Sequence, residues 1–184
     1  MSRAALFVIG LGANLGDRRA TLQAAVQALG RVGHVRAVSS LYETEPVGPP
    51  QPSFFNAAVL LESVLTPSHL LEQLLGIERA HGRERRERWG PRTLDLDILH
   101  SPELVLSEPR LTLPHPELPR RAFALAPLLE VFPGAVDPRT NVPYVDLLAS
   151  LSTTGLHRLE TSPSWCPLIV EPALPSIPNP SADP

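Results

Sequence analysis

The chain has 184 residues, of which 43% are hydrophobic and 19% are charged, and its formal net charge is −3. This length matches a single domain with one hydrophobic core and leaves no room for a second catalytic domain. No apolar run approaches the roughly 18 residues that a membrane-spanning helix needs, so the composition predicts a soluble globular protein. The small negative charge would not gather nucleic acid or an anionic membrane surface, and any anion site must therefore be local.

The basic residues and the single cysteine limit the reaction mechanisms that this chain can use. All 16 basic residues are arginine, so mechanisms that need a lysine amine, such as a Schiff base, are excluded. A bound phosphate would therefore be held by guanidinium groups. The only cysteine, Cys166, can form neither an internal disulfide nor a multi-thiolate zinc site. This usage of cysteine fits a reducing compartment and predicts a cytoplasmic protein.

Hydrophobic periodicity and helix-capping signals predict an alternation of strands and helices over residues 5–99. Asp17 is the expected N-cap of the first helix, and Pro67 is the expected first residue of the second. The expected elements are a strand 5–11, a helix 17–30, strands 35–42 and 55–63, a helix 68–82 and a strand 94–99. This βαββαβ order predicts an α+β, ferredoxin-like fold, in which helices cover one face of an antiparallel sheet.

Beyond this unit, we expect a short strand at 111–113 and helices at 121–131 and 144–151. Seven of the 22 prolines fall within 163–184, where apolar periodicity is weak. The sequence therefore predicts one catalytic domain over 1–162, followed by a proline-rich, disordered tail over 163–184. The alternative for the tail is a docking strand through 168–170.

The strongest local signal for chemistry is the pair Asp95 and Asp97 on the last strand of the unit. Side chains alternate along a strand, so the two carboxylates project from one face with their Cα atoms about 6 to 7 Å apart. Carboxylates at this spacing can bind one or two hard cations such as Mg²⁺. The alternative is a solvated outer face of an edge strand.

A cluster of arginines directly precedes these aspartates. Six of the 16 arginines lie between Arg79 and Arg92, and Trp89-Gly90-Pro91 places the cluster on a loop beside the carboxylates. Arginine forks bind terminal phosphate oxygens, while aspartates hold the bridging metals. The combination indicates a site for a polyphosphate with Mg²⁺, and the alternative is a set of surface ion pairs with the interleaved Glu84 and Glu87.

A second candidate surface is the proline-rich segment 44–56. Its four prolines prevent it from joining a strand ladder, but it can form a pocket wall in which Phe54 or Phe55 offers a ring and Asn56 a donor and an acceptor. The alternative is a plain connector with the phenylalanine in the core. No lysine-containing phosphate-binding loop exists, and Gly10-Leu11-Gly12 lacks the third glycine of the dinucleotide-binding motif.

Taken together, these segments resemble the hydroxymethyl-dihydropterin pyrophosphokinase family over about residues 6–133. The most specific match is the string Arg88-Trp89-Gly90-Pro91-Arg92-Thr93-Leu94-Asp95-Leu96-Asp97. Further blocks follow in compatible order, namely Gly12 to Asp17, Thr44 to Gly48, Phe54 to Ala58, Leu113 to Pro116 and Arg121 to Phe123.

The resemblance implies an enzyme of folate biosynthesis that transfers diphosphate from ATP to the hydroxymethyl group of 6-hydroxymethyl-7,8-dihydropterin, with AMP leaving. It implies two Mg²⁺ ions on Asp95 and Asp97, and it implies Arg83 and Arg92 as catalytic residues that stabilise charge on the transferred group. The implied pterin contacts are Thr44, Glu45, Val47, Phe54, Asn56 and Phe123. The implied ATP contacts are Leu71, Glu78, Arg85, Trp89, Ile98, Arg110, Thr112, His115 and Arg121.

Two other classes of function compete with this expectation. A ferredoxin-like sheet with an arginine-rich loop and a tryptophan is typical of RNA-binding modules, but Asp95 and Asp97 would repel a phosphate backbone unless metals intervene. The third class is a metal-dependent phosphohydrolase. From the residues alone, attack on the β-phosphorus and on the γ-phosphorus are both possible. We expect a monomer that acts on small molecules and binds neither nucleic acid nor membrane.

Overall fold

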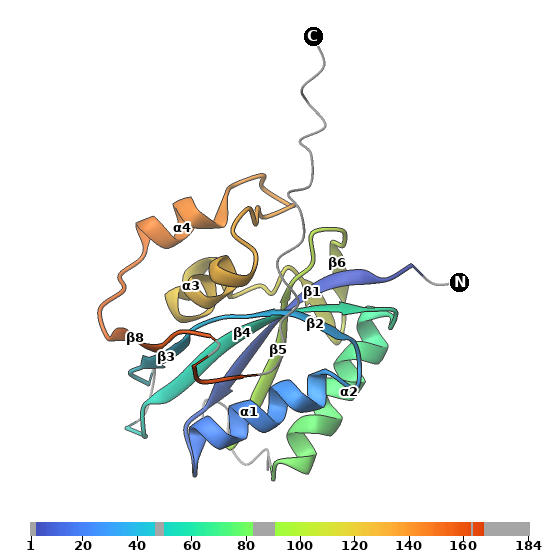
Figure 1. Ribbon diagram of the computed structural model, residues 1–184. Coiled ribbons are helices and arrows are strands. Elements are labelled where there is room, and N and C mark those ends of the chain that lie inside the picture. Colours follow the sequence, from blue (N-terminus) through green and yellow to red (C-terminus); the bar gives the residue numbers. More distant parts are fainter. Residues whose placement is uncertain (1–2, 47–49, 83–90, 163, 168–184) are drawn as a thin grey trace.

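The structure is a computed structural model that describes residues 3–46, 50–82, 91–162 and 164–167. The main sheet contains β1 (Ala5–Ala13), β2 (His34–Val38), β3 (Leu41–Thr44), β4 (Phe54–Ser63), β5 (Asp95–His100) and β8 (Leu156–Glu160). Its strand order is β5-β1-β4-β3-β8, and β2 also pairs with β4. All of these pairings are antiparallel (Figure 1).

The expected βαββαβ unit is present. Helix α1 (Arg18–Leu29) connects β1 to β2, and α2 (Pro67–Ala80) connects β4 to β5. Asp17 caps α1 by accepting a hydrogen bond from the Ala20 N–H, and the Thr66 hydroxyl caps α2 directly before Pro67. The sequence predicts both starts because a cap depends only on residues within one helical turn.

The strand expected over 35–42 is divided into two. β2 pairs with β4 at residues 59–62, and β3 pairs with it at residues 54–56. Between them, Ser39 donates its N–H to the Ala58 carbonyl and accepts the Ala58 N–H with its hydroxyl. A side chain therefore replaces the backbone in the ladder at this point, which ends one strand and begins the next.

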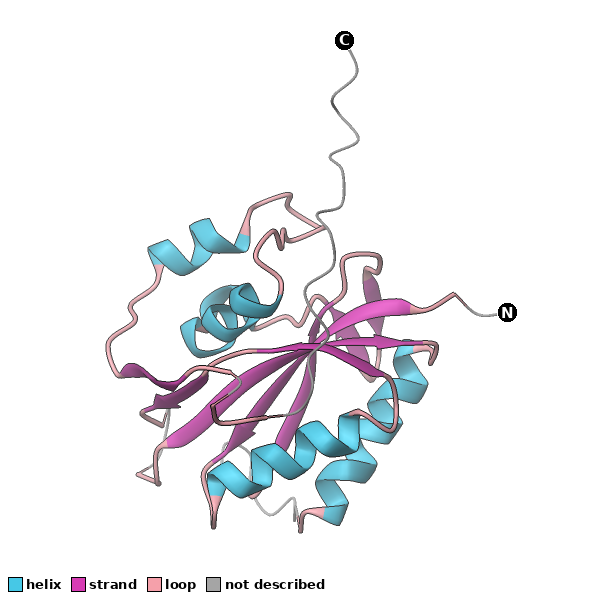
Figure 2. Ribbon diagram, viewed as in Figure 1, coloured by secondary structure: helices cyan, strands magenta, loops and turns pink. Residues whose placement is uncertain are grey.

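Helices cover both faces of the sheet, whereas the sequence predicts cover on one face (Figure 2). Alternate side chains of β1 point to opposite faces, and both sets are buried. Phe7 and Ile9 pack in the core beneath α1 and α2. Val8 packs with Leu60 and Leu99 beneath α3 (Ala122–Val131) and α4 (Tyr144–Ser150). The apolar side chains on this second face of the sheet are buried by the two C-terminal helices, α3 and α4.

The C-terminal part of the chain enters the core beyond the expected domain limit at 162. Strand β8, which the sequence analysis does not predict, pairs with β3. After it, Trp165 is fully buried and donates its indole N–H to the Ser39 carbonyl at 2.8 Å. Residues 164–167 therefore belong to the packed body, and the remainder of the expected tail, 168–184, lies outside the described residues.

The remaining described elements are short. β6 (Leu106–Glu108) and β7 (Leu111–Leu113) form a hairpin, and a 3-10 turn spans Leu118–Arg120. Of these, the sequence analysis predicts only the strand at 111–113. Among the helices of the described ranges, none is long and apolar enough to cross a membrane.

Candidate active site

A cavity of about 300 Å³ opens on the α3 face of the sheet, at the N-terminal end of this helix. Its floor comes from β1, β4 and β5, and its walls come from the segments before β4 and β5 and from the residues that lead into α3. The lining residues are Gly10, Leu11, Gly12, Thr44, Glu45, Gln51, Phe54, Asn56, Ala57, Arg92, Asp95, Asp97, Leu99, His115, Arg121, Phe123 and Ala124.

A glycine keeps the middle of the cavity open. Gly12 of β1 pairs with Asn56 of β4 on one side and with Asp95 of β5 on the other. A Cβ atom at Gly12 would lie 3.4 Å from the Asn56 Oδ1 and 3.8 Å from the Asp95 Cβ. Neighbouring strands are about 4.8 Å apart, which puts the backbones of Asn56 and Asp95 about 10 Å apart across β1. A larger side chain at Gly12 would fill the space between the amide and the carboxylate.

Asp95 and Asp97 form the acidic side of the cavity, on the one face that their spacing predicts. The intervening Leu96 points to the opposite face and is buried in the core under α1 and α2. The Arg92 guanidinium pairs with the Asp95 carboxylate, and both side chains are about three quarters buried. A cation and two carboxylates therefore meet at one wall.

The residues before α3 extend the polar side of the cavity. The His115 N–H donates to the Leu99 carbonyl at 2.8 Å, which holds this segment against β5. Burial lowers the pKa of the His115 imidazole below its ordinary value of 6.5. The negative charges of Asp97 and Asp95 oppose this shift, and the Arg121 guanidinium adds to it. At neutral pH His115 is therefore an uncharged hydrogen-bonding group beside the carboxylates.

Two aromatic rings line the other half of the cavity. Phe54 comes from the first residue of β4, and Phe123 comes from the first turn of α3. The adjacent Phe55 points to the opposite face, where the Arg18 guanidinium lies 3.7 Å above its ring. The alternation of β4 thus selects Phe54 from the two phenylalanines that the sequence offers.

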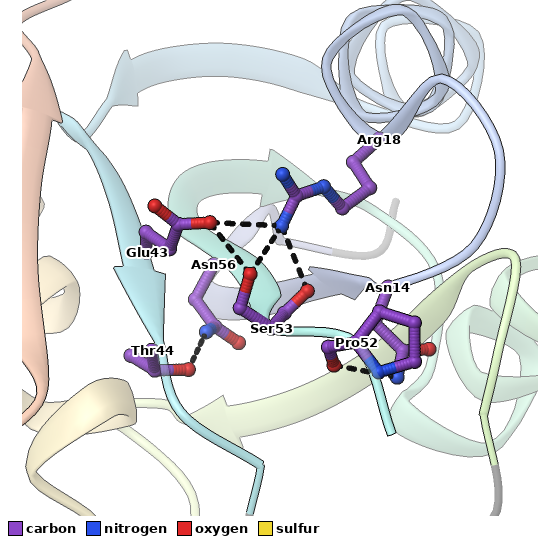
Figure 3. Close-up of polar contacts among 7 residues, drawn as sticks. All are labelled: Asn14, Arg18, Glu43, Thr44, Pro52, Ser53 and Asn56. Carbon is purple, nitrogen blue, oxygen red and sulfur yellow. Dashed lines mark hydrogen bonds and ion pairs between the residues drawn. The ribbon is translucent and has the colours of Figure 1, made fainter.

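A buried amide accompanies these rings. The Asn56 Nδ2 donates to the Thr44 hydroxyl at 2.7 Å, between the paired strands β4 and β3 (Figure 3). Both side chains are buried and both line the cavity. This hydrogen bond orients the Asn56 amide, so that a flat heterocycle placed between the rings would meet a fixed polar edge.

Helix α3 is held over the sheet by the carboxylate of Glu130. It accepts hydrogen bonds from the Tyr42 hydroxyl at 2.6 Å and from the Ser40 N–H at 2.5 Å. Burial, together with the Glu130 carboxylate, raises the pKa of Tyr42 above its ordinary range. Tyr42 therefore stays a donor at all ordinary pH values, and the helix that carries Phe123 is fixed to β3.

Ten of the expected site residues line this cavity, and five other described ones do not. Ile98 is buried in the core on the opposite face of β5, and Leu71 packs against the same core. Glu78 is buried and accepts the Leu96 N–H at 2.8 Å, which ties α2 to β5. Arg110 is exposed before β7, and Thr112 lies within that strand. These five residues lie outside the cavity wall.

Four expected site residues lie outside the described residues: Val47, Arg83, Arg85 and Trp89. The sequence analysis in turn misses several residues that line the cavity. Gln51 belongs to the proline-rich segment, and no feature of its neighbours distinguishes it from an ordinary loop residue. Gly12 is visible as one of two glycines within a strand, a pattern that often marks a close approach to a ligand or a second backbone.

The donor set fits Mg²⁺ bound together with the phosphates of a ligand. Within the part of the chain that the structure describes, no group of three or more His, Cys, Asp or Glu side chains is placed to hold an ion. Mg²⁺ at nucleotide sites is bound by one or two carboxylates together with phosphate oxygens and water, rather than by an all-protein cage. Asp95 and Asp97 match that arrangement, with Arg92 as a further positive charge beside them.

This fold is also found in solved crystal structures of another protein. The crystal structure of wild-type Plasmodium falciparum HPPK-DHPS matches with a TM-score of 0.65 at 15% sequence identity. The match covers 81% of this chain and 45% of that chain, so this chain spans less than half of the Plasmodium protein. At this identity the likeness supports the fold alone.

Sequence relatives are much closer. The chain is 42% identical over 151 residues to a 2-amino-4-hydroxy-6-hydroxymethyldihydropteridine pyrophosphokinase of Synechocystis, covering 81% of this chain and 77% of the relative. It is 44% identical over 155 residues to the protein of the same name from Methylorubrum extorquens, covering 83% and 97%. A family model described as 7,8-dihydro-6-hydroxymethylpterin-pyrophosphokinase (HPPK) matches residues 8–133. The cavity lies within this matched region, and the alignments with both relatives cover most of the chain. The chain therefore belongs to the HPPK family.

Proposed function

We infer that this protein transfers diphosphate from ATP to the hydroxymethyl group of 6-hydroxymethyl-7,8-dihydropterin, giving AMP and the pterin diphosphate, in folate biosynthesis. The observation that carries this inference is the division of one cavity into two adjoining halves. One half is aromatic with a fixed amide, and the other combines carboxylates with guanidinium groups. A flat pterin is complementary to the aromatic half, and a triphosphate is complementary to the charged half. The two halves adjoin, because only strand β1, at Gly12, lies between Asn56 and Asp95.

The pterin occupies the aromatic half in this proposal. Phe54 and Phe123 contribute aromatic rings, and an offset-stacked arrangement suits a flat heterocycle. Asn56, fixed by its hydrogen bond to Thr44, recognises the polar edge of the ring. Glu45, which lines the same cavity, and Val47 complete the proposed pterin contacts.

The triphosphate occupies the charged half. Asp95 and Asp97 would hold two Mg²⁺ ions, whose chemistry there is to neutralise charge on the phosphate oxygens. Arg121 and the uncharged His115 line the same half and can donate hydrogen bonds to phosphate or ribose oxygens. We also propose ATP contacts at Arg85 and Trp89. Five further proposed contacts do not line this cavity, so that they require the nucleotide to extend beyond its wall: Leu71, Glu78, Ile98, Arg110 and Thr112.

The reaction needs positioning and charge stabilisation rather than a covalent enzyme intermediate. The hydroxymethyl oxygen forms a bond to the β-phosphorus, and the bond between that phosphorus and the oxygen that bridges it to the α-phosphorus breaks. AMP leaves with the bridging oxygen, and the hydroxyl proton is released to the solvent. Arg92 lies beside Asp95 in the charged half, where it can stabilise charge on the transferred group, and we assign Arg83 the same role.

We further propose that the protein acts as a cytoplasmic monomer on these two small molecules. Cys166, the only cysteine, is buried, and a single buried cysteine suits a reducing compartment. We also propose that the catalytic domain continues through residue 167, because Trp165 completes its core.

The test is an incubation of the protein with ATP, Mg²⁺ and the pterin alcohol, followed by separation of nucleotides and pterins. The proposed function requires equal amounts of AMP and pterin diphosphate. ADP with pterin monophosphate would show attack on the γ-phosphorus. Free phosphate or diphosphate without a modified pterin would show a phosphohydrolase, and either result would reject the proposal.

A further inference from the structure

We propose that Asn14 is a positioning residue that couples the nucleotide half of the active site to the pterin half. The inference rests on the proposed function, because it concerns the affinity for those two substrates. Asn14 directly follows β1 and is 2% exposed. It lies behind the cavity wall rather than in it, so its effect on the substrates must pass through the residues that it holds.

Asn14 bridges two segments that are far apart in the sequence. Its Nδ2 donates to the Gln51 Oε1 at 3.0 Å and to the Pro52 carbonyl at 3.1 Å. Its Oδ1 accepts the Arg92 N–H at 2.7 Å, and its own N–H donates to the Arg92 carbonyl at 3.0 Å. One end of the amide therefore holds the segment before β4 (Figure 3). The other end holds the segment before β5.

Each held segment carries one half of the site. Gln51 and Arg92 themselves line the cavity. Phe54 follows Pro52 by two residues, and Asp95 follows Arg92 by three. A displacement of either segment would therefore move an aromatic ring or a carboxylate, and the rigid Asn14 amide would transmit that displacement to the other segment.

The chemistry of asparagine suits this position. Its planar amide presents two donors at one end and an acceptor at the other, which is what the two segments require. Aspartate would keep the acceptor for the Arg92 N–H but would lose both donors. Alanine would lose all three side-chain hydrogen bonds in a buried place, where unpaired polar groups are costly.

Arg18 provides a matched comparison, since it holds only the pterin side. Its Nη1 donates to the carbonyl and to the hydroxyl of Ser53, both at 2.8 Å, and pairs with Glu43 at 3.0 Å. In the described part of the chain, all hydrogen bonds of its guanidinium go to these two residues, on β3 and before β4 (Figure 3). The neighbouring Arg19 pairs with Glu160 instead, away from the cavity.

The experiment measures the dissociation constant of the pterin alcohol by calorimetry, with and without a non-hydrolysable ATP analogue and Mg²⁺. The ratio of the two constants is the coupling factor, which we expect to lie between roughly 5 and 100 in the wild type. In Asn14→Ala and Asn14→Asp we expect this factor to approach one. Arg18→Met should weaken pterin binding several-fold at an unchanged factor, and Arg19→Met should change neither quantity.

A wild-type coupling factor in both Asn14 variants, or a factor of one in the wild type, overturns the inference. If both variants fail to fold, as judged by near-ultraviolet circular dichroism, Asn14 is a folding determinant and the inference is also overturned. Equal loss of coupling in Arg18→Met would show a general loosening of the loop and would count against Asn14 as the link. Failure of the proposed function is recognised separately, because it appears as absent diphosphate transfer in the wild type.

Discussion

Asp95 and Asp97 share one face of β5 but differ in their surroundings. The Asp95 carboxylate is paired with Arg92, whereas Asp97 is the carboxylate that acts most strongly on the titration of His115. The two carboxylates thus have different charged neighbours in the same cavity, and a substitution of Asp97 leaves the ion pair between Asp95 and Arg92 in place. This difference makes Asp97 the more informative position for substitution.

Asp97→Asn keeps the size of the side chain and removes its charge. We expect turnover to fall by about 100-fold or more, because a bound metal loses an anionic ligand. The free energy of unfolding should change by less than about 1 kcal/mol, since the group lines a cavity. AMP formation and urea denaturation measure the two effects. Glu72→Gln, at an exposed position of α2, is the control, and equal activity of both variants would contradict the metal assignment.

His100 provides a test that concerns stability alone. It is 1% exposed and packs edge-on against the Tyr144 ring, with centroids 5.3 Å apart. Burial lowers its pKa to about 4, although Asp137 opposes the shift. The unfolded chain thus takes up this proton near its ordinary pKa of 6.5, and the folded chain takes it up only near 4.

Because the folded chain binds the His100 proton more weakly than the unfolded chain does, acid lowers the stability of the fold. The contribution of His100 is complete above about pH 6.5 and is lost as the pH falls toward 4, by up to about 3 kcal/mol. We expect His100→Asn to start less stable but to lose less stability over the same interval. Urea denaturation at several pH values measures both slopes, and parallel slopes in the two proteins would rule out this role of His100.

Among the elements, the C-terminal segment after β8 has a structural role that its proline content conceals. Trp165 fills the core between α1 and the sheet, and the Gln23 side chain donates to its carbonyl. This segment closes the outer part of the α1 face, opposite to the cavity. Its hydrogen bond to the Ser39 carbonyl anchors the link between β2 and β3, the strand that carries Thr44.

Trp165→Ala should lower the free energy of unfolding by about 3 to 5 kcal/mol, because it empties a fully buried site and leaves the Ser39 carbonyl without its donor. Below the unfolding transition, activity should stay within about twofold of the wild type, since the cavity lies on the other face. Denaturation and AMP formation test these expectations. Leu159→Ala, 43% exposed on β8, serves as the control, and a similar loss in both variants would contradict a specific role of Trp165.

For the whole molecule, ligand binding and folding are linked. A non-hydrolysable ATP analogue with Mg²⁺ at about 100 times its dissociation constant should raise the free energy of unfolding by about 2.7 kcal/mol. Thermal unfolding with and without a chelator measures the share that depends on Mg²⁺. We expect most of the increase to vanish without Mg²⁺ in the wild type. Equal stabilisation in both conditions would show that the carboxylates do not act through a metal.

Much of the fold is predictable from the sequence because it rests on short-range interactions. The Asp17 and Thr66 caps act within one turn, so the starts of α1 and α2 are predicted to within about one residue. The hydrophobic alternation of β5 places Asp95 and Asp97 on one face before any partner strand is known. The missed β8 has no such signal, since it is an edge strand whose residues are largely exposed.

The sequence by itself thus determined the βαββαβ order, the carboxylate pair and the motif strings that are similar to the HPPK family. Only the tertiary structure decided that Phe54 rather than Phe55 faces the cavity, that Gly12 lies between Asn56 and Asp95, and that Asn14 joins segments 37 and 78 positions away. The physical reason is the range of the interactions. Periodicity and capping act over a few residues, whereas strand register and long-range hydrogen bonds exist only after the sheet has brought distant segments together.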